Sequence, residues 1–108
     1  FDVRCLPNPY YIKELRSQTG CDSSVRDYVM SFEQSRILLD KIKDLLDFLI
    51  PLYVHEGKSQ LVICFGCTGG KHRSITFTEL VSDYLIKRGL RVQKSHRDIG
   101  KDISYYRT

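Results

Sequence analysis

The stretch that decides the expected fold is residues 61–74, which read LVICFGCTGGKHRS. Its first five residues are all apolar, a pattern typical of a strand covered on both faces in the middle of a sheet. Three glycines and a run of basic residues follow, and the apolar residues beyond them recur at helical spacing. The stretch therefore predicts a buried strand that turns through a glycine-rich loop into a helix.

The flanking sequence predicts the remaining elements of an α/β domain. Strands are expected at residues 1–6, 61–65 and 90–93, and helices at residues 9–16, 25–30, 32–50 and 71–88. Asn8 precedes a proline and is a good start for the first helix, Pro51 should end or kink the third, and Gly89 should stop the last.

Leaving out the short helix at residues 9–16, the order is β-α-α-β-α-β, so we expect one domain over residues 1–108 with a small, mainly parallel sheet and helices on both faces. Ligands of such sheets bind beyond the carboxyl ends of the strands. Three segments should meet at that edge, namely Pro7-Asn8, the loop Gly66–Ser74, and Ser95–Asp98.

Composition narrows the class of protein. The chain has 108 residues, of which 42% are hydrophobic and 28% charged, as in an ordinary globular domain. No apolar run approaches the ~20 residues that span a bilayer, so no membrane partner is expected. The first residue is Phe, and we expect the chain to be one domain of a longer protein.

Charge and cysteine content bear on partners and location. Residues 71–108 hold nine Lys and Arg against four Asp and Glu, whereas residues 1–70 hold eight against nine. This basic excess suits an anionic ligand or RNA, although a solvated basic face would give the same count. Cys64 and Cys67 have redox or zinc spacing, but no second ligand pair follows, so we expect no metal, no cofactor and a reduced, cytoplasmic setting.

The loop Gly66–Ser74 is the main candidate site, and it is predicted to bind phosphate. Glycines at 66, 69 and 70 let a backbone approach a ligand closely, and the amides that begin a helix favour an anion. The loop adds the hydroxyls of Thr68 and Ser74 and the cations of Lys71, His72 and Arg73. A tight turn with solvated basic residues is the structural alternative. We favour binding because consecutive basic residues at a helix start oppose its dipole.

Two catalytic motifs nearly match this loop. A Walker loop needs four residues between its glycines, whereas Gly66 and Gly70 enclose three, so an NTPase loop is excluded. The spacing of Cys67, Arg73 and Ser74 resembles that of cysteine-dependent phosphatases, in which Cys67 would attack phosphorus and Arg73 would hold the oxygens. Against this second interpretation, Gly66 stands where a His usually precedes the cysteine, and no acid-bearing loop is evident.

Further candidates lie outside the loop. Asp2 and Arg4 share one face of the first strand and could contact a ligand or form a surface ion pair. Asn8 could bind a ligand or cap a helix. His96 and Arg97 could bind an anion or form part of a charged loop.

Several of these motifs together resemble the C-terminal domain of the RapZ/YvcJ family. They are Asp2-x-Arg4-x-Leu6-Pro7-Asn8-Pro9, Thr19-Gly20-x-Asp22, Gly66-Cys67-Thr68-Gly69-Gly70-x-His72-Arg73-Ser74 and His96-Arg97-Asp98. The resemblance spans nearly the whole chain, and the long glycine-containing string is highly specific.

The resemblance implies a noncatalytic sensor domain for a phosphorylated amino sugar such as glucosamine-6-phosphate, or for a nucleotide-activated amino sugar, in the control of amino-sugar and cell-envelope metabolism. It implies that Asp2, Arg4, Thr68, Gly69, His72 and Arg73 line the pocket. It also implies an N-terminal ATP- or GTP-binding domain in the same chain, a homo-oligomer, and an RNA-adaptor role in one branch. This chain lacks that branch's basic tail, so a YvcJ-like Gram-positive member fits better.

Overall fold

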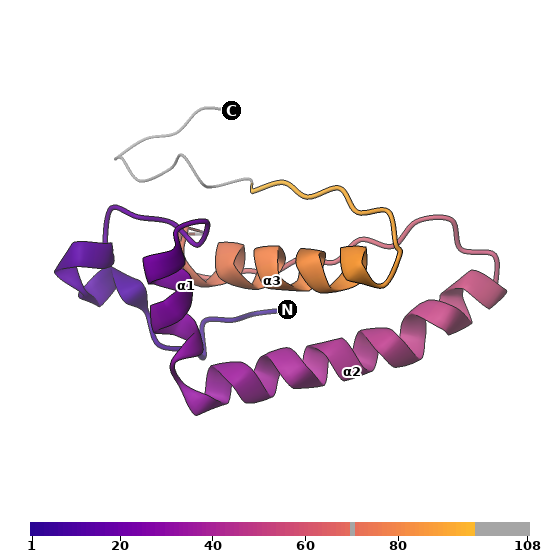
Figure 1. Ribbon diagram of the computed structural model, residues 1–108, viewed down its shortest axis with the longest axis horizontal. Helices are drawn as coiled ribbons and strands as arrows, with labels where there is room; N and C mark the ends of the chain where they lie inside the picture. The colour runs from indigo at the N-terminus through magenta and orange to yellow at the C-terminus, as the bar shows by residue number, and fades with distance from the viewer. Residues whose placement is uncertain (70, 97–108) are drawn as a thin grey trace.

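The computed structural model describes residues 1–69 and 71–96, and these residues form a helical structure. Two 3₁₀ helices, η1 (Pro9–Tyr11) and η2 (Lys13–Leu15), precede the helices α1 (Ser23–Met30), α2 (Glu33–His55) and α3 (Arg73–Lys87). Figure 1 shows α2 and α3 lying along the length of the molecule, with α1 crossing between them at one end. None of the helices in the described part of the chain is long and apolar enough to cross a membrane.

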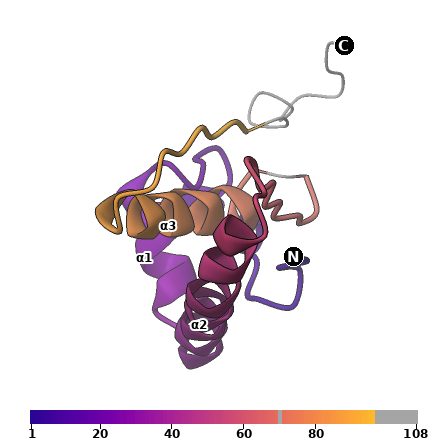
Figure 2. The same cartoon turned by 90° about the vertical axis from the view of Figure 1, so that its right-hand side faces the viewer.

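The core lies where the three α-helices meet the N-terminal segment. Helical spacing places Leu39, Ile42 and Leu46 of α2 on one buried stripe, while Leu45 on the same helix stays 42% exposed. From α3, Phe77 is completely buried. The end-on view in Figure 2 shows α2 and α3 as separate rods, with the N-terminal segment beside them.

The prediction that Pro51 ends or kinks the long helix near residue 50 was wrong about its end, because α2 continues through Pro51 to His55. A proline inside a helix removes one backbone hydrogen bond. Leu49 and Tyr53, two residues before and after Pro51, line one apolar pocket together with residues 61–64. The helix ends at His55, and Gly57 shortly after it has a φ of 86°, which suits the left-handed turn after a helix.

The expected parallel sheet is not seen, and the α/β prediction was wrong: the described residues contain no strand. The first and second expected strands do run side by side in parallel, but only through one isolated bridge between Asp2 and Gly66. Gly66 donates to the carbonyl of Phe1 and accepts from the amide of Val3, both at 2.8 Å. The chain then turns away, because the amide of Leu6 bonds back to the carbonyl of Val3 at 3.2 Å. A ladder needs longer pairing than this turn leaves.

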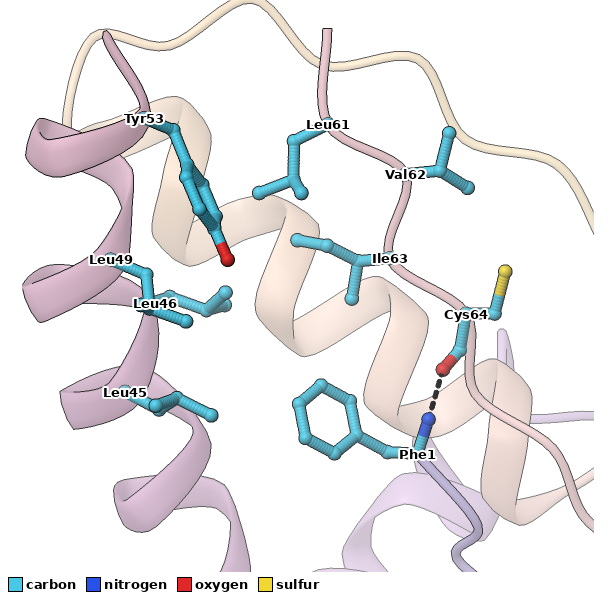
Figure 3. A pocket seen from close by; sticks show the side chains of 9 residues that line it. All are labelled: Phe1, Leu45, Leu46, Leu49, Tyr53, Leu61, Val62, Ile63 and Cys64. Carbon is cyan, nitrogen blue, oxygen red and sulfur yellow. Dashed lines mark hydrogen bonds between the residues drawn. The ribbon is translucent and has the colours of Figure 1, made fainter. Parts of the chain in front are cut away.

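Residues 61–64 show why an apolar run did not produce a central strand. Figure 3 shows Leu61 and Ile63 pointing towards α2, while Val62 and Cys64 point away from it. The inward side chains line a pocket of about 290 Å³ with Leu49 and Tyr53 of α2. The run therefore alternates as an extended chain does, but only one of its faces is covered, since Val62 is 72% exposed.

Candidate functional site

The loop that precedes α3 combines an exposed tip with a buried base. Thr68 and Gly69 are exposed, and Gly69 has a φ of 80°, a conformation that glycine adopts at little cost. The helix begins at Arg73, directly after His72. Its first amides therefore face the loop, where the helix dipole favours an anion.

Arg73 is the most deeply anchored cation of the loop. Its side chain is 4% exposed, and its Nη1 donates to the carbonyl oxygens of Arg4 at 2.8 Å and Leu6 at 2.9 Å. Its Nε is buried without a partner among the described residues. Arg73 thus fastens α3 to the N-terminal segment and still holds one donor whose burial is costly unless an acceptor reaches it.

His72 is also buried, at 5% exposed, and it connects the loop to η2. Its Nε2 lies 3.2 Å from the carbonyl oxygen of Leu15. A carbonyl only accepts, so Nε2 carries the proton and donates. Burial lowers the pKa of His72 below its usual value, the bond to Leu15 opposes this shift, and the nearby charge of Lys71 adds to it. The imidazole is therefore neutral at physiological pH.

Cys67 lies directly over the first turn of α3. Its Sγ accepts from the backbone amide of Ser74 at 3.3 Å, and the two side chains, Sγ and Oγ, are also 3.3 Å apart. A sulfur at the start of a helix is the position that a nucleophilic thiolate occupies in cysteine-dependent enzymes. The bonds of Arg73, however, run to the carbonyls of Arg4 and Leu6.

Asp2 and Arg4 form an ion pair at the surface beside the loop. Arg4 Nη2 lies 2.7 Å from Asp2 Oδ2, and Arg4 Nε and the Arg4 amide also bond to this carboxylate. These side-chain and backbone hydrogen bonds from Arg4 lower the pKa of Asp2 to about 2. The bridge to Gly66 places this pair next to the first glycine of the loop.

A groove of about 1230 Å³ brings several of the predicted residues together. It runs along α3 between residues 58–67 and residues 90–96. Its lining includes five of the candidates, which are Asp2, Gly66, Cys67, Ser74 and His96. The N-terminal segment, the loop and the segment after α3 thus meet at one concave surface, although no sheet organises them.

The remaining candidates lie elsewhere. Asn8 caps η1, because its Oδ1 accepts from the amide of Tyr10 at 3.0 Å. Lys71 is half-buried, and its carbonyl accepts from the amide of Gly20 at 3.0 Å. Gly70 and Arg97 lie outside the described residues.

Two residues that the sequence did not single out for the site support it. Gly20 is buried against the first turn of α3, where a Cβ would meet backbone atoms of Thr76 and His72. Glu79 lies on α3 and holds both Lys94 and His96, each at 2.8 Å. Gly20 belongs to the motif Thr19-Gly20-x-Asp22, but that motif gave it no role at the site, and nothing in the local sequence marks Glu79.

Comparison with known proteins adds to this geometry. The family model for the RapZ C-terminal domain matches residues 1–100 of this sequence. The chain belongs to this family. The loop over the start of α3 and the N-terminal ion pair therefore lie in a domain of the RapZ type.

Curated relatives support the assignment across most of the chain. A nucleotide-binding protein of Acetivibrio thermocellus is 57% identical over 102 residues, which cover 94% of this chain and 35% of that relative. One from Caldanaerobacter subterraneus is 55% identical over 102 residues, covering 94% of this chain and 36% of the relative. One from Clostridioides difficile is 55% identical over 98 residues, which cover 91% of this chain and 34% of that relative. The chain thus spans about a third of the length of the curated relatives it matches.

Proposed function

We propose that this domain is a noncatalytic sensor that binds a phosphorylated amino sugar through the loop Gly66–Ser74. The observation that carries the proposal is the arrangement at the start of α3. An exposed loop with a glycine at φ 80° lies beside a helix N-terminus and a buried arginine whose Nε has no partner among the described residues. A phosphate could accept from both kinds of donor.

The ion pair beside the loop supports an amino sugar as the ligand. Glucosamine-6-phosphate carries an ammonium group at one end and a phosphate at the other. In our proposal the phosphate lies against the loop, and Asp2 accepts from the ammonium group. Arg4 holds Asp2 in place through Nε and Nη2, and its guanidinium is largely exposed, so its positive charge stays accessible to the phosphate. A nucleotide-activated amino sugar, the alternative ligand, would offer its diphosphate to the same loop.

The wider role follows from the same proposal. The curated relatives are named as nucleotide-binding proteins and extend well beyond the matched region. We propose that this chain is the sensing part of such a protein, joined to an ATP- or GTP-binding domain and acting in amino-sugar metabolism as a homo-oligomer. An RNA partner is the part of this role with least support, because only the basic excess of residues 71–108 favours it.

One observation favours a second function, a cysteine-dependent phosphatase. The sulfur of Cys67 lies 3.3 Å from the amide of Ser74 at the start of α3. The bonds of Arg73 argue against it, because its Nη1 is engaged by two backbone carbonyls. In such a phosphatase the guanidinium would hold the phosphate oxygens.

Calorimetric titration of glucosamine-6-phosphate tests the sensor proposal. Thr68→Ala should leave stability within about 0.5 kcal/mol, because Thr68 is exposed. It should weaken binding roughly tenfold or more, the effect of losing one hydrogen bond to a charged group. Ser17→Ala, at an exposed serine outside the groove, is the matched control and should bind like the parent. Equal affinity in the Thr68 variant and the parent would refute binding at this loop.

A further inference from the structure

Beyond the loop, a second cluster of chemically able side chains lies on the outer face of α3. The sulfur of Cys21, a carboxylate oxygen of Glu79 and a ring nitrogen of His96 all lie within 4.8 Å of one another. They come from three separate parts of the chain: the turn before α1, the middle of α3, and the segment that follows α3. Figure 1 shows that last segment doubling back along α3 towards the turn before α1.

The donor atoms are those that zinc prefers. A thiolate, an imidazole nitrogen and a carboxylate oxygen are its usual ligands, and three protein ligands with one open position are a common zinc arrangement. Magnesium and calcium take oxygen ligands instead, so a sulfur and a nitrogen select against them. The thiolate and carboxylate would also balance the charge of a divalent ion.

The distances suit a metal with only small movements. His96 Nε2 and Glu79 Oε2 are 2.8 Å apart and share a hydrogen bond, which coordination of both atoms to a metal could replace. In a tetrahedral zinc site these two atoms would lie about 3.3 Å apart, and the sulfur about 3.6 Å from each. The pair would open by about half an ångström, and the exposed Cys21 side chain would move in by at most about 1.2 Å.

Lys94 does not block this arrangement. Its Nζ bonds to the other oxygen of Glu79, Oε1, at 2.8 Å. Carboxylates that bind metals commonly accept a second hydrogen bond that fixes their orientation. Lys94 could therefore keep its bond while Oε2 binds the metal. An ordinary ion pair explains Glu79, Lys94 and His96, but it gives no role to the sulfur beside them.

We propose that Cys21, Glu79 and His96 bind one zinc ion, which clips the segment after α3 to the turn before α1. The clip acts close to the loop, because Gly20, the neighbour of Cys21, donates its amide to the carbonyl of Lys71 at 3.0 Å. Zinc binding would thus restrain both sides of the start of α3. This proposal is independent of the ligand at Gly66–Ser74.

Metal titration of the intact, reduced protein, freed of nucleotide and divalent ions, tests the clip. Zinc should bind at one equivalent per chain in competition with a chromophoric chelator. Cobalt in the same site should give a sulfur-to-cobalt charge-transfer band in the near ultraviolet. Cys21→Ser should abolish that band. Glu79→Gln and His96→Ala should each weaken zinc binding by at least about 10–100-fold. That is the usual loss when a residue that only hydrogen-bonds to a metal ligand is removed, and removing a ligand itself should cost no less.

Matched controls make the outcome decisive. Cys5→Ser and His55→Asn change an exposed cysteine and an exposed histidine outside the cluster, and both should bind zinc like the parent. Zinc should raise the thermal midpoint of the parent and of both controls, but not of the Cys21 variant. A cobalt band that survives in Cys21→Ser, or that disappears in Cys67→Ser instead, would overturn the proposal. So would the absence of any zinc-dependent shift in the parent.

Discussion

Replacing Gly20 by alanine should destabilise the domain, because there is no room for a side chain at that position. A Cβ on Gly20 would lie 2.3 Å from the amide nitrogen of Thr76, 2.6 Å from the carbonyl oxygen of His72 and 2.8 Å from the Cβ of Ile75. Two of these three atoms belong to the backbone of the first turn of α3. They cannot rotate away as the end of a flexible side chain could.

The size of the effect follows from these contacts. The amide of Thr76 would have to retreat by at least about 0.7 Å to reach 3.0 Å, which real Cβ atoms almost never undercut. That amide donates to the carbonyl of His72 at 3.0 Å, so the movement would strain the first hydrogen bond of the helix. Overpacking of this kind costs about 1–3 kcal/mol. Alanine also restricts the unfolded chain, which stabilises the fold by about 0.4–1 kcal/mol, so we expect a net loss of about 1.3 kcal/mol.

Urea unfolding followed by far-ultraviolet circular dichroism measures this loss. With a slope of about 1.5 kcal/mol per molar urea, the midpoint should fall by about 0.9 M. Gly66→Ala is the matched control, because a Cβ there meets nothing within 4 Å and the φ of Gly66 is not positive. Its free energy of unfolding should stay within about ±0.5 kcal/mol of the parent's, the range that surface changes produce. Equal midpoints for Gly20→Ala and the parent would refute the close packing of the turn on α3.

Three further predictions concern the loop and its neighbours. Burial lowers the pKa of His72, so as the pH falls below about 6.5 the unfolded chain takes up a proton before the folded chain does, and the free energy of unfolding should fall. His72→Gln should make this pH dependence weaker in urea titrations at several pH values, whereas His55→Gln should leave it unchanged. Asp2→Asn should narrow a preference for glucosamine-6-phosphate over glucose-6-phosphate in competition titrations. The hydrogen bonds from Arg4 lower the pKa of Asp2 to about 2, so the carboxylate of the parent should stay ionised, and keep this preference, down to about pH 3. The parent should release no product from an activated aryl phosphate; a burst that Cys67→Ser removes would favour the phosphatase instead.

Helices were predictable from the sequence because their apolar spacing depends on residues close together in the chain. The predicted helices at residues 25–30, 32–50 and 71–88 correspond to α1, α2 and α3. The stop at Gly89 is confirmed by its φ of 86° directly after α3 and Arg88. The continuation through Pro51 was not predictable from local sequence, because a proline inside a helix removes a hydrogen bond and usually ends or kinks it.

The sheet could not be predicted correctly because a strand needs a partner that its own sequence does not specify. Residues 61–65 carry the expected apolar pattern, but whether a neighbour pairs along their whole length depends on where residues 1–6 turn. The candidate site was less dependent on the sheet. Asp2 and Gly66 meet through one isolated bridge, and the segment after α3 adds His96 to the same groove, so the residues come together without a full sheet.

The start of α3 separates residues that build the site from residues that could contact a ligand. Arg73 and His72 are buried and bond to carbonyls of Arg4, Leu6 and Leu15, so they fix the helix against the N-terminal segment whether or not an anion is bound. Thr68 is exposed and does not fix the helix in this way. Removing Arg73 should therefore lower stability and affinity together, whereas removing the hydroxyl of Thr68 should lower affinity alone. Because His72 and Arg73 are already held by these buried bonds, they lose little entropy when an anion binds at the start of α3, and this preorganisation would contribute to its affinity.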